Sequence, residues 1–135
     1  EGQGALLTMR RALEDAGLPP GAVSQINAHG TGTPVGDRAE AIAISRLFPA
    51  QTPVCSIKGA VGHTIAAAGA VELAATVGAM QAGFAPGTVN CRQPDPSCPI
   101  HVQRDPSEGA PGVVLSNSFG FGGQNASIVV AHPDW

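Results

Sequence analysis

The chain contains the same order of segments twice, and this repeat limits the folds that it can adopt. Residues 23–29 form a short apolar run that ends before Gly30, which predicts a buried strand. A loop of glycine and threonine follows, and Asp37 with Glu40 three residues later indicates a capping box at the start of a helix. Pro49 ends this helix, whose expected apolar face is Ala39, Ile42, Ala43 and Leu47.

The second unit follows directly. Residues 53–57 (PVCSI) predict a strand, the sequence KGAVGHT predicts a loop, and residues 65–82 predict a long alanine-rich helix that Gly83 ends. Upstream of both units, residues 4–16 predict an amphipathic helix that Gly17 terminates. Helices that alternate with buried strands indicate an α/β layer domain.

The last third of the chain adds a hairpin to this plan. Residues 86–111 are rich in proline and aspartate, and they predict a connection with one short strand at 100–103. The runs GVVLSNS and NASIVVAH predict two strands, separated by the glycine-rich hairpin FGFGGQ. We therefore expect one α/β domain over residues 1–135, with a mixed sheet.

Charge and composition exclude several classes of function. The formal net charge is -3 and only 13% of the 135 residues are charged, so there is neither a basic stripe for nucleic acid nor a polybasic patch for a membrane. The helix over 65–82 is about long enough to cross a bilayer, but Glu72 lies mid-way along it, which favours a buried helix. No cleavable leader is recognisable, and we expect a cytoplasmic protein.

Two histidines follow the two predicted strands. In open α/β sheets the loops at the carboxyl ends of strands hold the site, and His29 and His63 both lie on such loops. A helix amino terminus near His63 favours a neutral ring that donates a hydrogen bond. For His29 alone, a structural role in a loop of turns is at least as good an interpretation. Lys58 and Glu72 are the natural ion pair of this region, unless both charges extend to solvent.

The cysteines and the remaining histidine support neither a nucleophile nor a metal site. Cys55 lies within a predicted strand, Cys91 and Cys98 lie in the irregular connection, and none forms a C-x-x-C pair. His29, His63 and His101 are not paired at three- or four-residue spacing. The last constellation, NSFGFGGQNAS, fits either a tight hairpin with two core phenylalanines or a loop that brings backbone N–H groups to a ligand.

Three motifs in this order, NAHGTGTPVGDRAE, SIKGAVGHTIAAAGAVE and NSFGFGGQNAS, strongly resemble the carboxyl-terminal half of the elongating β-ketoacyl-acyl carrier protein synthases. The opening EGQGALLTMRRALEDAGLPP also looks like the helix that precedes the first motif there, so the resemblance covers nearly the whole chain. It implies a thiolase-like fold: two similar halves in a layered α-β-α-β-α architecture, of which this chain is most of the second half.

The resemblance implies a role for each motif residue in decarboxylative condensation of malonyl-carrier protein with an acyl thioester. His29 and His63 match the histidine pair that donates hydrogen bonds to the thioester oxygen. Lys58 and Glu72 match the pair that holds the histidines and the local electrostatic field in place. Phe121 matches the gating residue, whose N–H completes an oxyanion hole. By the same resemblance the substrate-binding residues are Thr31 and Thr33, for the pantetheine arm, and Phe119 and Gly122.

The same resemblance implies what the chain needs from elsewhere. The nucleophilic cysteine of these enzymes lies in the amino-terminal half, so that half, an acyl carrier protein and a homo- or heterodimer are the expected partners. No cofactor is expected beyond the phosphopantetheine that carries the substrates. Three alternatives are weaker: a non-catalytic chain-length-factor-like partner, which usually lacks the histidines; a thiolase, which the GTGT and FGFGG loops disfavour; and a nucleotide-binding module, which leaves Lys58 and Glu72 unexplained.

Overall fold

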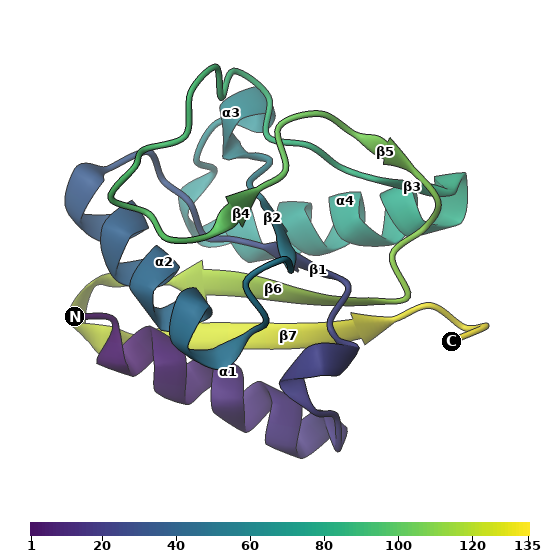
Figure 1. The fold of residues 1–135 in the computed structure, drawn as a ribbon, viewed down its shortest axis with the longest axis horizontal. Coiled ribbons are helices and arrows are strands. Elements are labelled where there is room, and N and C mark those ends of the chain that lie inside the picture. The colour runs from purple at the N-terminus through teal and green to yellow at the C-terminus, as the bar shows by residue number, and fades with distance from the viewer.

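A five-stranded sheet runs through the middle of the computed structural model, which describes residues 1–135 (Figure 1). The strand order is β4-β2-β1-β6-β7. The four strands from β4 to β6 are parallel, and β7 is antiparallel to β6, so the expected mixed sheet and terminal hairpin are confirmed. The bounds are β1 Gln25–Asn27, β2 Pro53–Cys55, β4 His101–Val102, β6 Val113–Phe119 and β7 Asn125–Ala131.

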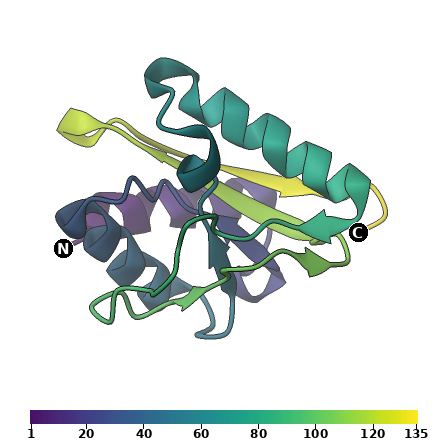
Figure 2. The same cartoon turned by 90° about the horizontal axis from the view of Figure 1, so that it is seen from above.

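Helices cover both faces of this sheet (Figure 2). Helices α1 (Gln3–Ala16) and α2 (Pro34–Leu47) lie on one face, and α4 (Ala68–Ala82) lies on the other. The single-turn helix α3 (Lys58–Val61) follows β2 directly, where the sequence predicts a loop. Two very short strands, β3 (Phe84–Ala85) and β5 (Ser107–Glu108), form a separate antiparallel pair in the connection. Turns of 3-10 helix occupy Pro20–Ala22, Ile65–Ala67 and Phe121–Gly123.

The core lies between the sheet and the pair α1 and α2. In the middle of the sheet Ile26 pairs with Val54 on one side and Leu115 on the other, and Ile26 and Leu115 are completely buried. Met9 on α1 is also completely buried, as expected for the apolar face of this helix. Burial of such side chains contributes roughly 1.5–3 kcal/mol each, and this holds α1 on the sheet.

The predicted capping box is wrong. Helix α2 begins at Pro34, three residues before Asp37, and its N-cap residue Thr33 makes no side-chain capping bond. Proline suits this first position because it has no N–H to leave unpaired. The buried face also differs from the expected one: the buried residues of α2 are Glu40, Ala41, Ala43 and Ile44.

The predicted long helix over 65–82 also differs from the expectation. Its first three residues form a 3-10 turn in which Ile65 has a φ of 53°, and the α-helix begins at Ala68. By length and composition this is one stretch that could cross a membrane, and 28% of it is buried within the chain. Only one face is buried, because the opposite face meets no other element here; the buried residues are Ala68, Glu72, Thr76, Ala79 and Met80.

The central position of β6 generates a stability prediction. Leu115→Ala removes a completely buried side chain, and we expect it to lower the free energy of unfolding by about 2–5 kcal/mol through lost burial and the cavity left behind. Leu7→Ala, at a helix position that is 45% exposed, is the matched control and should change it by about 0.5 kcal/mol or less. Urea unfolding of the two variants measures both, and equal losses would contradict this account of the core.

Candidate active site

The parallel pairing of β1 and β2 brings the two histidine loops to one edge of the sheet. Both loops leave the carboxyl ends of adjacent parallel strands. The rings of His29 and His63 lie with centroids 5.5 Å apart, nearly perpendicular to each other at 86°. Although 34 residues separate them in the sequence, the two rings therefore face one small region.

His29 is held as a neutral ring. Its pKa is lowered from the ordinary value of 6.5 to about 4, first because burial disfavours the charged form, and then because Lys58 and His63 lie nearby. Its Nδ1 atom is buried and has no hydrogen-bond partner within the chain. In the imidazolium form both ring nitrogens carry an N–H, and the N–H at Nδ1 would be buried without an acceptor. This is a further reason for the ring to remain neutral.

The orientation of His63 is set by its neighbour in the chain. The backbone N–H of Ile65 donates to Nδ1 of His63 at 3.1 Å. In the neutral ring the proton is then carried by Nε2, which is free to donate. His63 lies between α3 and the 3-10 turn, five residues before α4, and its side chain is exposed in this chain. The hydrogen bond from Ile65, rather than a helix terminus, thus prepares the ring as a donor.

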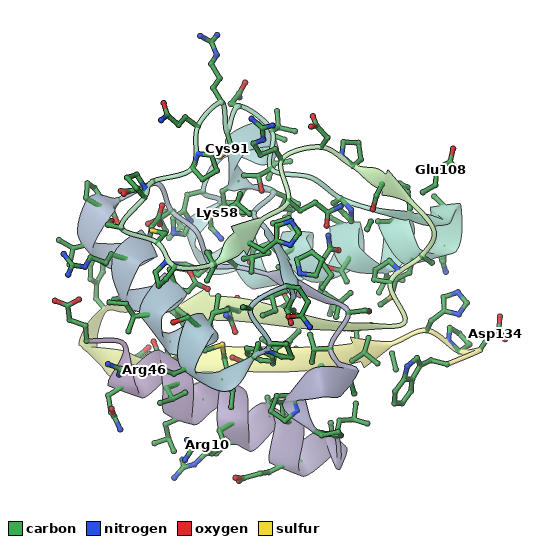
Figure 3. The ribbon with its side chains drawn as sticks, in the orientation of Figure 1. Arg10, Arg46, Lys58, Cys91, Glu108 and Asp134 are labelled. Atoms are coloured by element: carbon green, nitrogen blue, oxygen red, sulfur yellow. The ribbon has the colours of Figure 1, made fainter.

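Lys58 and Glu72 form a buried ion pair, as the sequence predicts. The ammonium group of Lys58, at the start of α3, contacts the carboxylate of Glu72 on the buried face of α4. The two side chains are only 6% and 2% exposed, which rules out the alternative that both extend to solvent. Figure 3 shows Lys58 within the fold, whereas Arg10 and Arg46 extend from the outer faces of α1 and α2.

The threonine loop separates two hollows beside the histidines. The hydroxyls of Thr31 and Thr33 lie 3.1 Å apart at the start of α2. A hollow of about 530 Å³ has Thr31, Lys58 and His63 in its lining, and a smaller one of about 270 Å³ has Thr31, His29 and Phe119. The loop thus borders both hollows, one of which is lined by His63 and the other by His29.

The hairpin loop is divided between the site and the solvent. Phe119 is the last residue of β6, and its ring centroid lies 5.8 Å from that of His29. The side chain of Phe121 is fully exposed, so the interpretation of two core phenylalanines is wrong for this residue. Gly122 has a φ of 76°, a left-handed conformation that turns the loop tip and favours glycine. Phe121 and Gly122 therefore lie on the exposed tip, apart from the buried ion pair.

The three cysteines line the larger hollow together with Lys58 and His63. Cys55 is buried in β2, and burial raises the pKa of its thiol to about 12, so it is not a thiolate at neutral pH. Cys91 and Cys98 lie in the connection before β4, and burial raises the pKa of Cys98. No group of three or more histidine, cysteine, aspartate or glutamate side chains is arranged to hold a metal ion.

Two buried polar residues, Glu40 and Asn117, and the partly buried Ser56 surround the His29 loop, and the sequence does not predict their contacts. The carboxylate of Glu40 accepts hydrogen bonds from the backbone N–H groups of His29 and Gly30, both at 2.9 Å, and from Asn117. Ser56 donates to the carbonyl oxygen of Gly30 at 3.0 Å, which ties the two histidine loops together. One signal was available: Glu40 stands beside alanines and isoleucines on α2, a position where a carboxylate needs partners.

The arrangement can stabilise a negative charge that develops on a bound oxygen. The imidazole rings of His29 and His63 can present N–H donors near each other, and the lowered pKa of His29 keeps that ring neutral. The ammonium group of Lys58, although paired with Glu72, lies near enough to contribute to the lowered pKa of His29. Preorganised donors of this kind favour an enolate or oxyanion over a neutral carbonyl.

The fold and this site define a thiolase-like protein of the ketosynthase class. The chain belongs to the β-ketoacyl synthase family: residues 1–92 match the model of the β-ketoacyl synthase C-terminal domain. It is 41% identical to a mitochondrial 3-oxoacyl-[acyl-carrier-protein] synthase of Arabidopsis thaliana, over 97% of this chain and 30% of the relative. The chain thus spans about a third of the length of the relatives that it matches.

Solved structures agree with this assignment. A β-ketoacyl synthase from Burkholderia phymatum superimposes with a TM-score of 0.92 at 38% identity, over 97% of this chain and 33% of that one. A type II polyketide synthase acyl-carrier protein in complex with its ketosynthase gives a TM-score of 0.89 at 30% identity, over 97% and 34%. The resemblance inferred from the three motifs is therefore confirmed, as is the thiolase-like fold.

The low pKa of His29 predicts a specific dependence on pH. Between pH values of about 6.5 and about 4 the unfolded chain binds more protons at His29 than the folded chain does. The contribution of His29 to the free energy of unfolding is therefore lost as the pH falls through that range. Histidine-selective NMR should find the His29 ring neutral at pH 5, with the signal assigned by its absence in His29→Gln. A ring that titrates near 6.5 in the folded protein would show that the site does not hold it neutral.

The buried ion pair predicts an asymmetric response to mutation. Glu72→Ala leaves the Lys58 ammonium group buried without a partner, and we expect a loss of about 3–5 kcal/mol in the free energy of unfolding. Lys58→Met with Glu72→Met removes both charges and should recover most of this loss. Arg38→Ala breaks the exposed contact to Glu1 and should cost about 1 kcal/mol or less. Equal effects of Glu72→Ala and Arg38→Ala in urea unfolding would contradict the role of burial.

Proposed function

We propose that this chain supplies the decarboxylation half of a ketosynthase active site. The observation that carries the proposal is the pair of rings 5.5 Å apart, His29 with its lowered pKa and His63 with its Nδ1 atom engaged by Ile65. Two neighbouring N–H donors suit a thioester oxygen that gains charge. The reaction is the decarboxylative Claisen condensation of malonyl-carrier protein with an acyl thioester, in fatty acid or polyketide synthesis.

In this mechanism His29 and His63 donate hydrogen bonds to the thioester oxygen of the malonyl group. The bond between its α-carbon and the carboxylate breaks, CO2 leaves, and the electron pair forms an enolate that the two donors stabilise. The enolate carbon then attacks the carbonyl carbon of an acyl group held on an enzyme cysteine, and the cysteine leaves as a thiolate. The Lys58 and Glu72 pair takes no proton in these steps; it maintains the local field and supports the loop that carries His63.

The remaining loop residues have binding roles in this proposal. Thr31 and Thr33 hydrogen-bond the pantetheine arm of the substrate. The reaction needs no cofactor beyond the phosphopantetheine of the carrier protein. Phe121 gates access from the hairpin tip, and its backbone N–H contributes to the oxyanion hole of the acyl thioester. Phe119 and Gly122 shape the surface beside the substrate. The exposure of Phe121 supports a role against another segment, because its ring packs on nothing in this chain.

The proposed activity requires an amino-terminal half that holds the nucleophilic cysteine. The high thiol pKa of Cys55 and its burial in β2 support this requirement, as does a length of about a third of that of the matched relatives. An acyl carrier protein is the proposed partner, and the similarity to a ketosynthase solved with its acyl-carrier protein supports it. A homo- or heterodimer is part of the same proposal.

The test follows CO2 release from malonyl-carrier protein by the protein that joins this chain to its amino-terminal half. His29→Ala and His63→Ala should each slow release by about 100- to 1000-fold, because each removes one preorganised donor. His101→Ala, at an exposed position of β4, is the control and should not change the rate. A full rate in either site variant would refute the role of that histidine. An unmodified protein that releases no CO2 would instead indicate a chain-length-factor-like partner.

A further inference from the structure

Glu40 is a buried carboxylate that contacts the histidine loop only through its backbone. It lies on the inner face of α2 and is 5% exposed. Its Oε1 atom accepts from the N–H of His29 and from the side-chain amide of Asn117, and its Oε2 atom accepts from the N–H of Gly30, all at 2.9 Å. No lysine, arginine or histidine forms an ion pair with it.

This burial is unfavourable in itself. Burial raises the pKa of Glu40, and the hydrogen bonds from Gly30, Asn117 and His29 oppose that rise. An apolar side chain of similar volume would avoid the desolvation of a charge, so stability alone does not account for a carboxylate here. Three donors on two oxygens, however, need an acceptor-only group, which an ionised carboxylate provides and an amide does not.

The two backbone hydrogen bonds fix the direction of the His29 side chain. Consecutive N–H groups point at one carboxylate, and Gly30 has a φ of 40°, so the peptide between His29 and Gly30 is held in a turned orientation. A Cβ atom at Gly30 would lie 2.7 Å from Ser56, so this turn also allows the two histidine loops to approach closely. The position of the His29 ring relative to His63 therefore depends on this contact.

The contact extends from the histidine loop to the base of the hairpin. Asn117, which is completely buried in β6, donates to Glu40, and its Oδ1 atom accepts from the hydroxyl of Ser127 at 2.7 Å. Asn117 lies two residues before Phe119, whose ring neighbours that of His29. Glu40 thus joins α2, the His29 loop and the β6–β7 hairpin through side chains that are closed off from solvent.

We propose that Glu40 is a positioning residue for decarboxylation: it acts through the backbone of His29 and touches no substrate. The inference rests on the proposed function, because it assigns Glu40 to the donor geometry of that site. Donors are effective only where the oxyanion will form, and a displacement of about 1 Å at such a group can cost roughly 100-fold in rate. Glu40→Gln places an NH2 group against one of the two backbone N–H groups and breaks that hydrogen bond.

The experiment is a double-mutant cycle on the protein that joins this chain to its amino-terminal half. Glu40→Gln should lower kcat for CO2 release by about 10- to 100-fold and leave KM for malonyl-carrier protein unchanged. In a His29→Ala background the same change should alter the rate by less than about 2-fold, because the group that it positions is gone. Glu14→Gln, on an exposed position of α1, is the matched control and should leave the rate unchanged.

The outcomes separate this inference from the proposed function. A full rate in Glu40→Gln, or an equal fall with and without His29, would overturn the positioning role while leaving the role of His29 intact. A full rate in His29→Ala would remove the proposed function itself. If Glu40→Gln does not fold, as judged by thermal melting, Glu40→Asp keeps the charge but shortens the reach, and the same cycle with the same expectations applies to it.

Discussion

The pairing of β1 with both β2 and β6 is the constraint on which the rest of the structure depends. Ile26 in the middle of β1 hydrogen-bonds and packs between Val54 and Leu115, in two parallel ladders. Parallel strands end at the same edge of a sheet, so the loops after β1 and β2 and the hairpin after β6 emerge together. Every residue proposed to act on substrate follows or ends one of these three strands.

Around this edge the core changes from apolar to polar. Ile26 and Leu115 in the sheet and Met9 on α1 form the apolar part of the core, whereas Lys58, Glu72, Glu40 and Asn117 are buried polar residues. Asn117 joins the two parts, because its side-chain amide donates to the sulfur of Met9 at 3.4 Å. Each of these buried polar groups costs free energy unless a partner satisfies it, and each has at least one partner on a different element. The same contacts that offset the desolvation therefore determine where the histidine rings lie.

How far the sequence predicts this site depends on the range of each interaction. The pair Lys58 and Glu72 could be predicted because a cation and a carboxylate on largely apolar segments need each other. The local spacing of Asp37 and Glu40 predicts a capping box, but α2 begins at Pro34, and Glu40 is buried on the face of α2 that packs against the domain. No local pattern connects Glu40 to Asn117, which is 77 residues away. Likewise, the exposure of Phe121 follows from the hairpin geometry rather than from its apolar character.

The sequence by itself determined the alternation of strands and helices, the terminal hairpin, the motifs that mark the family and the two loops that carry histidines. These are encoded by periodicity and by residue types within about twenty positions, and local physics is sufficient for them. Only the tertiary structure decided which side chains surround His29, how the His63 ring is oriented and which face of α2 and of α4 is buried. Those features arise from contacts between distant segments, whose register depends on the packing of the whole sheet.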